Sequence, residues 1–193
     1  SVLSLAIDRA GRIWAGTQGH GLWMLPSGTG ALQQVADAGS TGAINGICLS
    51  ADDTGWLACE KGLFRLQEDV GNPHHLSLQR QDVPSVREPL RSVLVDHNQN
   101  IWMATRANGL YIYFPKTGFL DRLKEDFSST RGLLSNHIYS LAEDRWGGIW
   151  IASEEGIQSF HDRVQLFNVY PGISSRSSEL RALIIFGLVE LDN

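Results

Sequence analysis

Residues 5–17 read LAIDRAGRIWAGT, and this stretch recurs three more times along the 193-residue chain. The later copies begin at Ile47, Val93 and Leu141. Each copy holds one tryptophan, and the four are Trp14, Trp56, Trp102 and Trp150. They are spaced by 42, 46 and 48 residues. A repeat of about 40–50 residues with strand-type content is typical of a β-propeller blade.

Each repeat predicts four short strands, because apolar and β-branched runs alternate with clusters of Gly, Asp, Asn, Ser and Pro. In the first repeat the expected strands cover residues 3–7, 13–17, 22–25 and 31–35. In the third repeat they cover residues 91–95, 101–105, 110–114 and 119–123. A small sheet with an apolar face must stack on neighbouring sheets. We therefore predict an all-β chain built from four-stranded antiparallel propeller blades.

The repeat spacing divides the chain into four blades and a remnant. The expected segments are 1–42, 43–89, 90–136, 137–175 and, for a degenerate fifth blade, 176–193. The remnant lacks the long turn expected between its strands. Closed propellers usually have about six to eight blades, with a minimum of about four, so a chain with four repeats predicts an incomplete ring. Closure with four blades, or completion by another copy or segment, are the alternatives.

A turn between the first two strands explains the aspartates of the repeat. Asp8, Asp96 and Asp144 are expected to accept backbone N–H bonds in this turn. Gly11 and Gly147 are expected to take a positive φ, which suits residues without a Cβ. We predict that these five residues have a structural role, and that the four tryptophans pack between blades.

Composition excludes several classes of protein. The chain is 42% hydrophobic, too apolar for a disordered chain. Its net charge is −5 and it has no basic block, so we expect no nucleic-acid partner. The longest apolar run, residues 182–189, is far shorter than a membrane-spanning helix. Two cysteines cannot form a disulfide scaffold, and the expected strand register places Cys48 and Cys59 on opposite faces as buried free thiols.

Motifs for catalysis, cofactors and metals are missing from the sequence. The glycines at residues 28–30 do not form a phosphate-binding loop, and there is no G-x-S-x-G motif. His74 and His75 are adjacent, so in extended backbone their side chains point apart and do not favour a shared metal. We expect no cofactor, no metal and no catalytic residue.

The repeat pattern I-x-S-L-x-x-D-x-x-G-x-I-W-x-G-T-x-x-x-G-L resembles the two-component regulator propeller repeat. The similarity is strongest in residues 5–22 and in GLLSNHIYSLAED at residues 132–144, and it extends to about residue 170. The resemblance implies a seven-bladed propeller in the extracytoplasmic sensor region of a hybrid two-component histidine kinase or a sensor diguanylate cyclase. It also implies a periplasmic location in an inner-membrane sensor, with immunoglobulin-like and cytoplasmic signalling domains downstream.

We therefore expect a ligand- or partner-binding sensor module without its effector domain, which is not itself an enzyme. The ligand class, whether small molecule, glycan or protein, stays open, and a homodimer is a further option. Binding is expected on loops that follow the second strand or precede the first strand, since loops on rigid sheets often carry function. The candidates are His20, Lys61, Arg91, Arg106, Asn108, Asn136, His137, Glu154 and Glu155.

Two alternatives remain from the residues. The first is a propeller lyase or glycosidase with an axial active site. Asp8-x-x-Gly11-x-x-Trp14 resembles the Asp box of sialidase-type propellers, with one extra residue and without its serine, but such boxes are fold devices. Such an enzyme would need its acidic and basic groups to converge. The candidates for that cluster are Arg91, Arg106, Tyr139 and Glu154. The second alternative is a propeller with a purely structural interaction role.

Overall fold

The computed structural model describes residues 1–28, 30–36, 38–50, 54–69, 72–126, 132–161 and 166–171. These residues form strands β1 to β16 and one short helix, α1 (Ala38–Thr41). None of the helices in this described part has the length or hydropathy of a membrane-spanning segment. The expected fifth-blade remnant, residues 176–193, lies outside the described residues.

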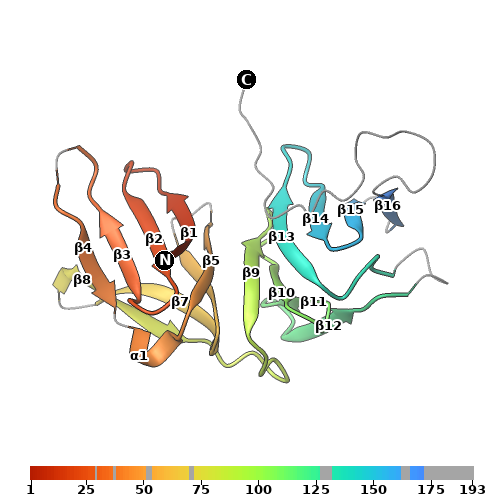
Figure 1. The fold of residues 1–193 in the computed structure, drawn as a ribbon, viewed down its shortest axis with the longest axis horizontal. Coiled ribbons are helices and arrows are strands. Elements are labelled where there is room, and N and C mark those ends of the chain that lie inside the picture. Colours follow the sequence, from red (N-terminus) through yellow and green to blue (C-terminus); the bar gives the residue numbers. More distant parts are fainter. Residues whose placement is uncertain are drawn as a thin grey trace. The chain divides into compact units, whose positions relative to one another are not determined.

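The strands form four antiparallel sheets of four strands, each in chain order (Figure 1). The first sheet contains β1 (Val2–Ile7), β2 (Ile13–Thr17), β3 (Leu22–Leu25) and β4 (Gln33–Ala36). The second contains β5 (Ile44–Leu49), β6 (Gly55–Cys59), β7 (Gly62–Asp69) and β8 (Asn72–Arg80). The third contains β9 (Leu90–Val95), β10 (Ile101–Thr105), β11 (Leu110–Phe114) and β12 (Phe119–Leu123). The fourth contains β13 (Ile138–Glu143), β14 (Ile149–Ser153), β15 (Gly156–His161) and β16 (Leu166–Pro171).

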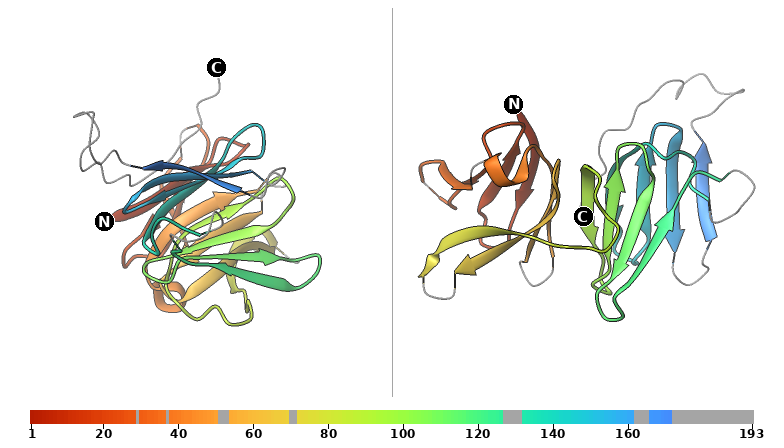
Figure 2. Two further views of the ribbon diagram at one scale, coloured as in Figure 1. Left: turned by 90° about the vertical axis from the view of Figure 1, so that its right-hand side faces the viewer. Right: turned by 90° about the horizontal axis from the view of Figure 1, so that it is seen from below.

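This architecture confirms the predicted all-β fold with propeller blades of four antiparallel strands. Two further views show the strands of each sheet side by side (Figure 2). The strands expected in the first and third repeats begin and end within two residues of the observed bounds. Alternating apolar runs and turn residues therefore located the strands correctly.

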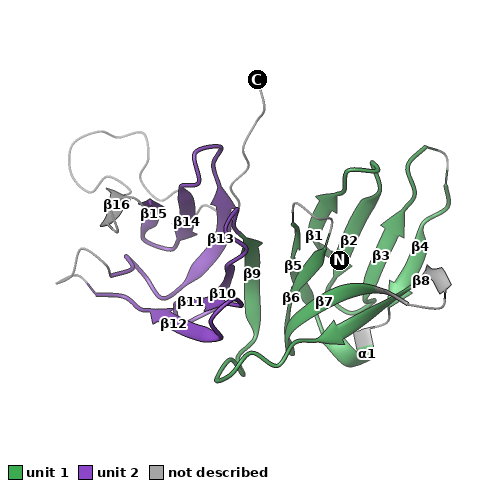
Figure 3. Cartoon of the chain, turned by 180° about the vertical axis from the view of Figure 1, so that it is seen from behind, with its two compact units in different colours: residues 1–95 green, residues 96–193 purple. Residues whose placement is uncertain are grey.

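The chain divides into two compact units, which are described separately below (Figure 3). Unit 1 is Ser1–Val95 and unit 2 is Asp96–Asn193. In unit 1 the first strands of successive sheets are neighbours, because β1 packs against β5 and β5 packs against β9. In unit 2, β13 packs against β10.

The strand register determines which residues face the next sheet. Ala6 pairs with Trp14, and Trp14 pairs with Met24, so these three residues share one face of the first sheet. Trp14 is buried there in a core cluster with Leu57 and Phe64 of the second sheet. Large apolar side chains that meet between two sheets supply most of the stabilising burial in this architecture.

The third and fourth sheets meet in a similar way inside unit 2. The ring centroids of Trp102 in β10 and Phe160 in β15 are 5.7 Å apart, in a tilted arrangement. Trp14 and Trp102 thus both contact the following sheet. Trp56 and Trp150 are half-buried.

A β-bulge recurs at the start of the first strand. The pairing register shifts between residues 2 and 4, between 44 and 46, and between 138 and 140. Leu3, Asn45 and Tyr139 are therefore the extra residues of three equivalent bulges. A repeated bulge adds local twist at the same place in each of these three sheets.

The bulge changes one expectation about the cysteines. Cys48 pairs with Trp56, as the regular register predicts, but Cys59 pairs with Ile44 rather than with residue 45. Neither cysteine forms a disulfide, yet only Cys59 is buried, whereas Cys48 is half-buried, so the expectation of two buried thiols is wrong for Cys48. Burial raises the pKa of the Cys59 thiol to about 12, so it remains protonated at neutral pH.

Candidate functional site

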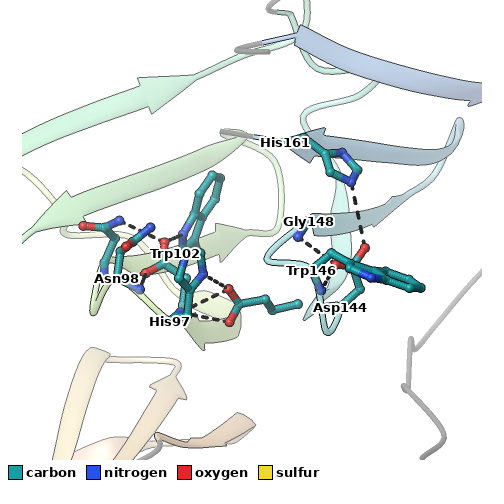
Figure 4. A network of polar contacts seen from close by, with 10 residues as sticks. His97, Asn98, Trp102, Asp144, Trp146, Gly148 and His161 are labelled. Atoms are coloured by element: carbon teal, nitrogen blue, oxygen red, sulfur yellow. Dashed lines mark hydrogen bonds and ion pairs between the residues drawn. The ribbon is translucent and has the colours of Figure 1, made fainter. Parts of the chain in front are cut away.

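One end of each sheet carries the turn between its first two strands, and the aspartates lie there. The carboxylate of Asp96 accepts the backbone N–H groups of Asn98 and Asn100, at 2.9 and 2.8 Å. Its second oxygen accepts the indole N–H of Trp102 at 2.8 Å (Figure 4). Oδ1 of Asp96 therefore accepts the backbone bonds that close the turn, and Oδ2 accepts the indole bond that orients Trp102.

Asp144 repeats this arrangement in the fourth sheet. It accepts the backbone N–H groups of Trp146 and Gly148, at 2.9 and 2.8 Å, and the indole N–H of Trp150 at 2.8 Å. The glycine of the turn, Gly147, has a φ of +81°. The Asp–Gly–Trp spacing of the repeat thus encodes a hydrogen-bonded turn that holds a packing side chain.

Asp8 forms the same turn in the first sheet, with an added cation. It accepts the backbone N–H of Arg12 at 2.8 Å, the Trp14 indole N–H at 3.0 Å and the Arg12 guanidinium at 2.5 Å. Gly11 has a φ of +76°. At the equivalent place in the third sheet, Gln99 takes a φ of +69° despite its side chain.

The hydrogen bonds shift the acidity of two of these carboxyl groups. Burial alone raises the pKa of Asp8 and of Asp144. The indole N–H and backbone N–H bonds outweigh burial, so the pKa of each lies below its ordinary value of 3.8. For Asp144, His161 adds a further lowering influence on the pKa. These groups are therefore ionised acceptors at neutral pH, which suits a structural role.

Polar contacts between His97 and Glu143 link the third and fourth sheets at this end of unit 2. The backbone N–H of His97 donates to both carboxylate oxygens of Glu143, at 3.1 and 3.0 Å, and the imidazole Nδ1 contacts the same carboxylate (Figure 4). A Cβ on Gly147 would come within 2.7 Å of the His97 ring. The small glycine therefore leaves room for this ring between the two turns.

The other end of each sheet carries the loops that the sequence analysis selected. The loop after the second strand hydrogen-bonds to the segment that leads into the first strand of the same sheet. The bonds run from Gln18 N–H to the Ser1 carbonyl, from Glu60 N–H to Ala43, and from Glu154 N–H to His137, at 3.0, 2.8 and 3.1 Å. Because these bonds are between backbone groups, they fix the loops independently of side-chain identity.

A hydroxyl inside the second-strand loop adds rigidity. Thr17 and Thr105 donate to the carbonyls of Gly21 and Gly109, each at 2.8 Å. The same hydroxyls accept the backbone N–H groups of His20 and Asn108, each at 2.9 Å. The candidates His20 and Asn108 therefore lie at the same position of equivalent, rigid turns.

Unit 1 contains three of the candidate residues. His20 is exposed, and its carbonyl accepts bonds from the side chains of Trp23 and Gln34. The Lys61 ammonium donates to the carbonyl of Gly39 at 2.6 Å. Arg91 is half-buried in β9. His20 and Lys61 thus have different bonding partners within unit 1.

Unit 2 contains the other six candidates, and four of them belong to one hydrogen-bonded group of loops. The Asn136 side-chain oxygen accepts the Glu125 N–H at 3.0 Å, and its carbonyl accepts the Gly109 N–H at 3.0 Å. The Asn108 carbonyl accepts the Arg122 guanidinium, at 3.2 and 3.3 Å. We call residues 106–109, 136–137 and 154–155 the unit 2 rim.

An ion pair joins the last two of these segments. His137 Nδ1 lies 3.1 Å from a Glu154 carboxylate oxygen, and both side chains are 51% exposed. Glu155, the residue after Glu154, is exposed, and so is Arg106 in the first segment of the rim. In this arrangement the unit 2 rim presents polar side chains to solvent on backbone that is fixed by hydrogen bonds.

The charges on and next to the unit 2 rim are of both signs. Three cationic side chains are exposed, namely Arg106, Arg122 and Lys124, and four anionic ones, namely Glu125, Asp126, Glu154 and Glu155. Among the residues that the structure describes, no group of three or more His, Cys, Asp or Glu side chains is placed to hold a metal ion. The exposed side chains of the rim include both hydrogen-bond donors and hydrogen-bond acceptors.

Gln158 is a residue that the sequence reasoning missed. It is fully buried in β15, where it accepts the Leu134 N–H at 2.6 Å and donates to the Gly132 carbonyl at 3.1 Å. It thereby fixes the segment that leads to Asn136 and His137. The repeat could have identified this residue. The equivalent positions of the other three sheets hold the aromatic residues Trp23, Phe64 and Tyr111, so a glutamine there departs from the pattern.

Comparison with known proteins agrees with this architecture. Residues 132–155 match the sequence profile of the family described as "Two component regulator propeller", which confirms the expected resemblance for this segment. The matched segment contains the unit 2 rim residues Asn136, His137, Glu154 and Glu155. Comparison with curated proteins gives no match.

Solved structures share the fold. The extracellular domain of a one-component system from B. thetaiotaomicron aligns with a TM-score of 0.71 at 21% identity, over 97% of this chain and 24% of that chain. The extracellular domain of a hybrid two-component system from the same organism aligns with a TM-score of 0.54 at 20% identity, over 68% of this chain and 19% of that chain. A virginiamycin B lyase from Staphylococcus aureus aligns with a TM-score of 0.66 at 12% identity, over 91% of this chain and 56% of that chain. The chain thus spans about a quarter or less of the length of the two extracellular domains.

Proposed function

We propose that the chain is a ligand- or partner-binding sensor module of a bacterial signal-transduction protein, and that binding takes place on the unit 2 rim. The observation that carries this proposal is the overlap between the family match and the rim. The segment at residues 132–155 matches a sensor-associated repeat, and the same segment supplies four of the nine candidate residues. Loops that are fixed by backbone bonds and expose polar side chains are suited to recognition.

The setting of the module is part of the proposal. It lies in the periplasm within an inner-membrane sensor, followed in the longer protein by immunoglobulin-like and cytoplasmic histidine kinase or diguanylate cyclase domains. Support comes from two similar structures that are extracellular domains of one- and two-component systems. The blade segments 1–42, 43–89, 90–136 and 137–175 are the repeating units of this sensor, within a seven-bladed ring.

The ligand is a polar molecule of low net charge. The four exposed anions and three exposed cations on and next to the unit 2 rim disfavour a polyanion, because repulsion from the anionic side chains offsets attraction to the cationic ones. Exposed amide, imidazole and carboxylate groups suit hydroxyl and peptide groups instead. Neutral oligosaccharides and short peptides both fit this description.

We further propose that the chain has no catalytic activity of its own. A general acid–base pair usually depends on burial to tune its pKa values. The His137–Glu154 pair is half-exposed, so water screens the interaction between its two groups. The expected convergence of Arg91, Arg106, Tyr139 and Glu154 stays a prediction of the enzyme alternative.

A thermal-shift screen tests the binding proposal. The probes are neutral oligosaccharides, short peptides and, as a polyanion, heparin. A ligand present at about 100 times its Kd stabilises the folded state by about 2.7 kcal/mol, which corresponds to a Tm increase of about 5–10 °C for a chain of this size. We expect such an increase with a neutral probe and none with heparin.

Matched variants assign the shift to the rim. Arg106→Ala combined with Glu155→Ala removes two exposed side chains of the unit 2 rim. Lys116→Ala removes an exposed charge from the turn between β11 and β12, at the opposite end of the third sheet. The Tm increase should disappear in the double variant and persist in Lys116→Ala. The opposite pattern, or a shift that only heparin produces, would contradict the proposal.

A further inference from the structure

One contact between the third and fourth sheets joins a histidine to a carboxylate. His97 lies in the turn between β9 and β10, and Glu143 is the last residue of β13. The imidazole Nδ1 of His97 contacts the carboxylate, and the backbone N–H of His97 donates to both carboxylate oxygens, at 3.0 and 3.1 Å. The side chain of Glu143 is 17% exposed and that of His97 is 56% exposed. A largely buried carboxylate is therefore held by a side chain that can gain or lose a proton near neutral pH.

The repeat shows that the fold does not require a carboxylate at this position. The residues equivalent to Glu143, seven positions before each tryptophan, are Ile7, Leu49 and Val95. The other three sheets thus form the same four-stranded topology with an apolar residue here. A carboxylate that is largely buried costs free energy unless it is paired. The presence of His97 opposite Glu143 is therefore what makes a glutamate suitable at the end of β13.

Two glycines leave room for imidazole rings at the turn between β13 and β14 (Figure 4). A Cβ on Gly147 would lie 2.7 Å from the His97 ring, and a Cβ on Gly148 would lie 2.6 Å from Nε2 of His161. His161 in turn lies 4.0 Å from the Asp144 carboxylate. The residues equivalent to Gly148 in the other sheets all have side chains, namely Arg12, Thr54 and Asn100. The glycine pair and the two imidazoles are therefore specific to this turn.

The other charged groups around the His97–Glu143 contact come from its own turn, from the β13–β14 turn and from β15. The carboxylates of Asp96 and Asp144 already accept backbone and indole N–H groups. The guanidinium of Arg145 lies 5.3 Å from the ring centroid of Trp146, and His161 faces Asp144. β10 and β14 carry no charged residue. Glu143 is thus the carboxylate that the imidazole of His97 contacts.

We propose that the His97–Glu143 contact is a pH-sensitive link between the third and fourth blades, stronger when the imidazole is protonated than when it is neutral. A neutral imidazole offers the carboxylate a hydrogen bond, whereas an imidazolium adds the attraction between opposite charges. In unstructured chains histidine titrates at about pH 6.5 and glutamate at about pH 4.3, so both groups are charged near pH 5.5. The link therefore stabilises the folded chain below about pH 6.5, and this contribution is lost as the imidazole releases its proton at higher pH. It rests on contacts within unit 2 and not on the proposed sensor function.

NMR titration of the histidine side chains tests the link. Glu143→Gln removes the charge and keeps an oxygen that can accept the His97 N–H. The midpoint of the His97 titration should be lower in this variant by about 0.2–0.7 pH unit, as expected for the loss of a partly exposed charge pair. His20, which is exposed in unit 1, is the internal control, and its midpoint should not move. A His97 midpoint that stays unchanged or rises would overturn the proposal.

A double-mutant cycle measures the same link through stability. The Tm is recorded at pH 5.5 and at pH 8 for the unmodified chain, His97→Gln, Glu143→Gln and the double variant. At pH 5.5 the Tm loss of the double variant should be smaller than the sum of the two single losses by about 1–3 °C. This difference should be smaller at pH 8, where the imidazole is neutral. A difference that is equal at the two pH values, or larger at pH 8, would overturn the proposal.

The second histidine of the turn supplies the matched control. His161→Gln replaces His97→Gln in an otherwise identical cycle with Glu143→Gln. Because His161 faces Asp144 rather than Glu143, its coupling to Glu143 at pH 5.5 should be weaker than that of His97. Equal coupling of the two histidines to Glu143 would show that the effect comes from the general charge of the turn, and would overturn the assignment of the link to His97.

Discussion

At the scale of single residues, the aspartate carboxylates link the turns of three blades to their packing. Asp8, Asp96 and Asp144 each accept the indole N–H of the tryptophan six residues later. The turn bonds follow from the Asp–Gly spacing and were expected from the sequence. The indole bond was not, because it depends on the reach of two side chains across a hairpin rather than on local residue preference.

We predict that Trp150→Phe lowers the free energy of unfolding by about 1–3 kcal/mol, because the Asp144 carboxylate loses a charged hydrogen bond. Urea unfolding followed by circular dichroism measures this loss. Trp146→Phe in the same turn is the control, because Trp146 is 80% exposed and its backbone N–H bond to Asp144 survives the change. Equal losses in the two variants would contradict the role of the indole bond.

We also predict a dependence of stability on acid pH. The pKa of Asp144 is lowered in the folded state from its ordinary value of 3.8, so the unfolded chain binds the proton more tightly. The stabilisation is present above that ordinary value and is lost as the pH falls through the lower folded pKa. Tm measured from pH 5 down to about pH 2 should therefore fall less steeply in Asp144→Asn than in the unmodified chain. Parallel curves would contradict the prediction.

At the scale of the elements, the strands were predictable and the exceptions to the repeat were not. Apolar and β-branched runs between clusters of turn residues located β1 to β3 and β9 to β12 closely. The bulges escaped prediction, because a one-residue shift in pairing leaves the residue pattern of a strand unchanged. That shift is why Cys59 pairs with Ile44 and not with Asn45.

Among the residues that depart from the repeat, Gln158 has the largest expected effect on a loop. We predict that Gln158→Leu destabilises the chain by about 1–3 kcal/mol, because the Leu134 N–H and the Gly132 carbonyl lose their partner. Hydrogen exchange should become faster at residues 132–134 than at residues 105–109, which have their own hydroxyl bond. Unchanged exchange at residues 132–134 would show that Gln158 does not position this segment.

For the candidate site, too, the sequence predicted some features and not others. The sequence identified the loops by their place after second strands and before first strands. It did not reveal that Asn136 contacts Glu125, or that His137 pairs with Glu154. Those contacts depend on how blade connections fold back on the loops, which the repeat pattern does not encode.

At the scale of the whole molecule, the four repeats define the fold, whereas the evidence for function comes from a shorter segment. All four sheets have propeller-blade topology. The family match covers residues 132–155, which contain two of the three segments of the unit 2 rim, 136–137 and 154–155. The unit 2 rim is the surface on which we propose that a polar ligand is recognised.

The proposed sensor role is tested most directly by reading the full open reading frame that encodes this chain. The account predicts a membrane-spanning segment downstream, followed by a histidine kinase or diguanylate cyclase domain. A reading frame that encodes no signalling domain, or that joins these blades to a lyase or glycosidase active site, would contradict it.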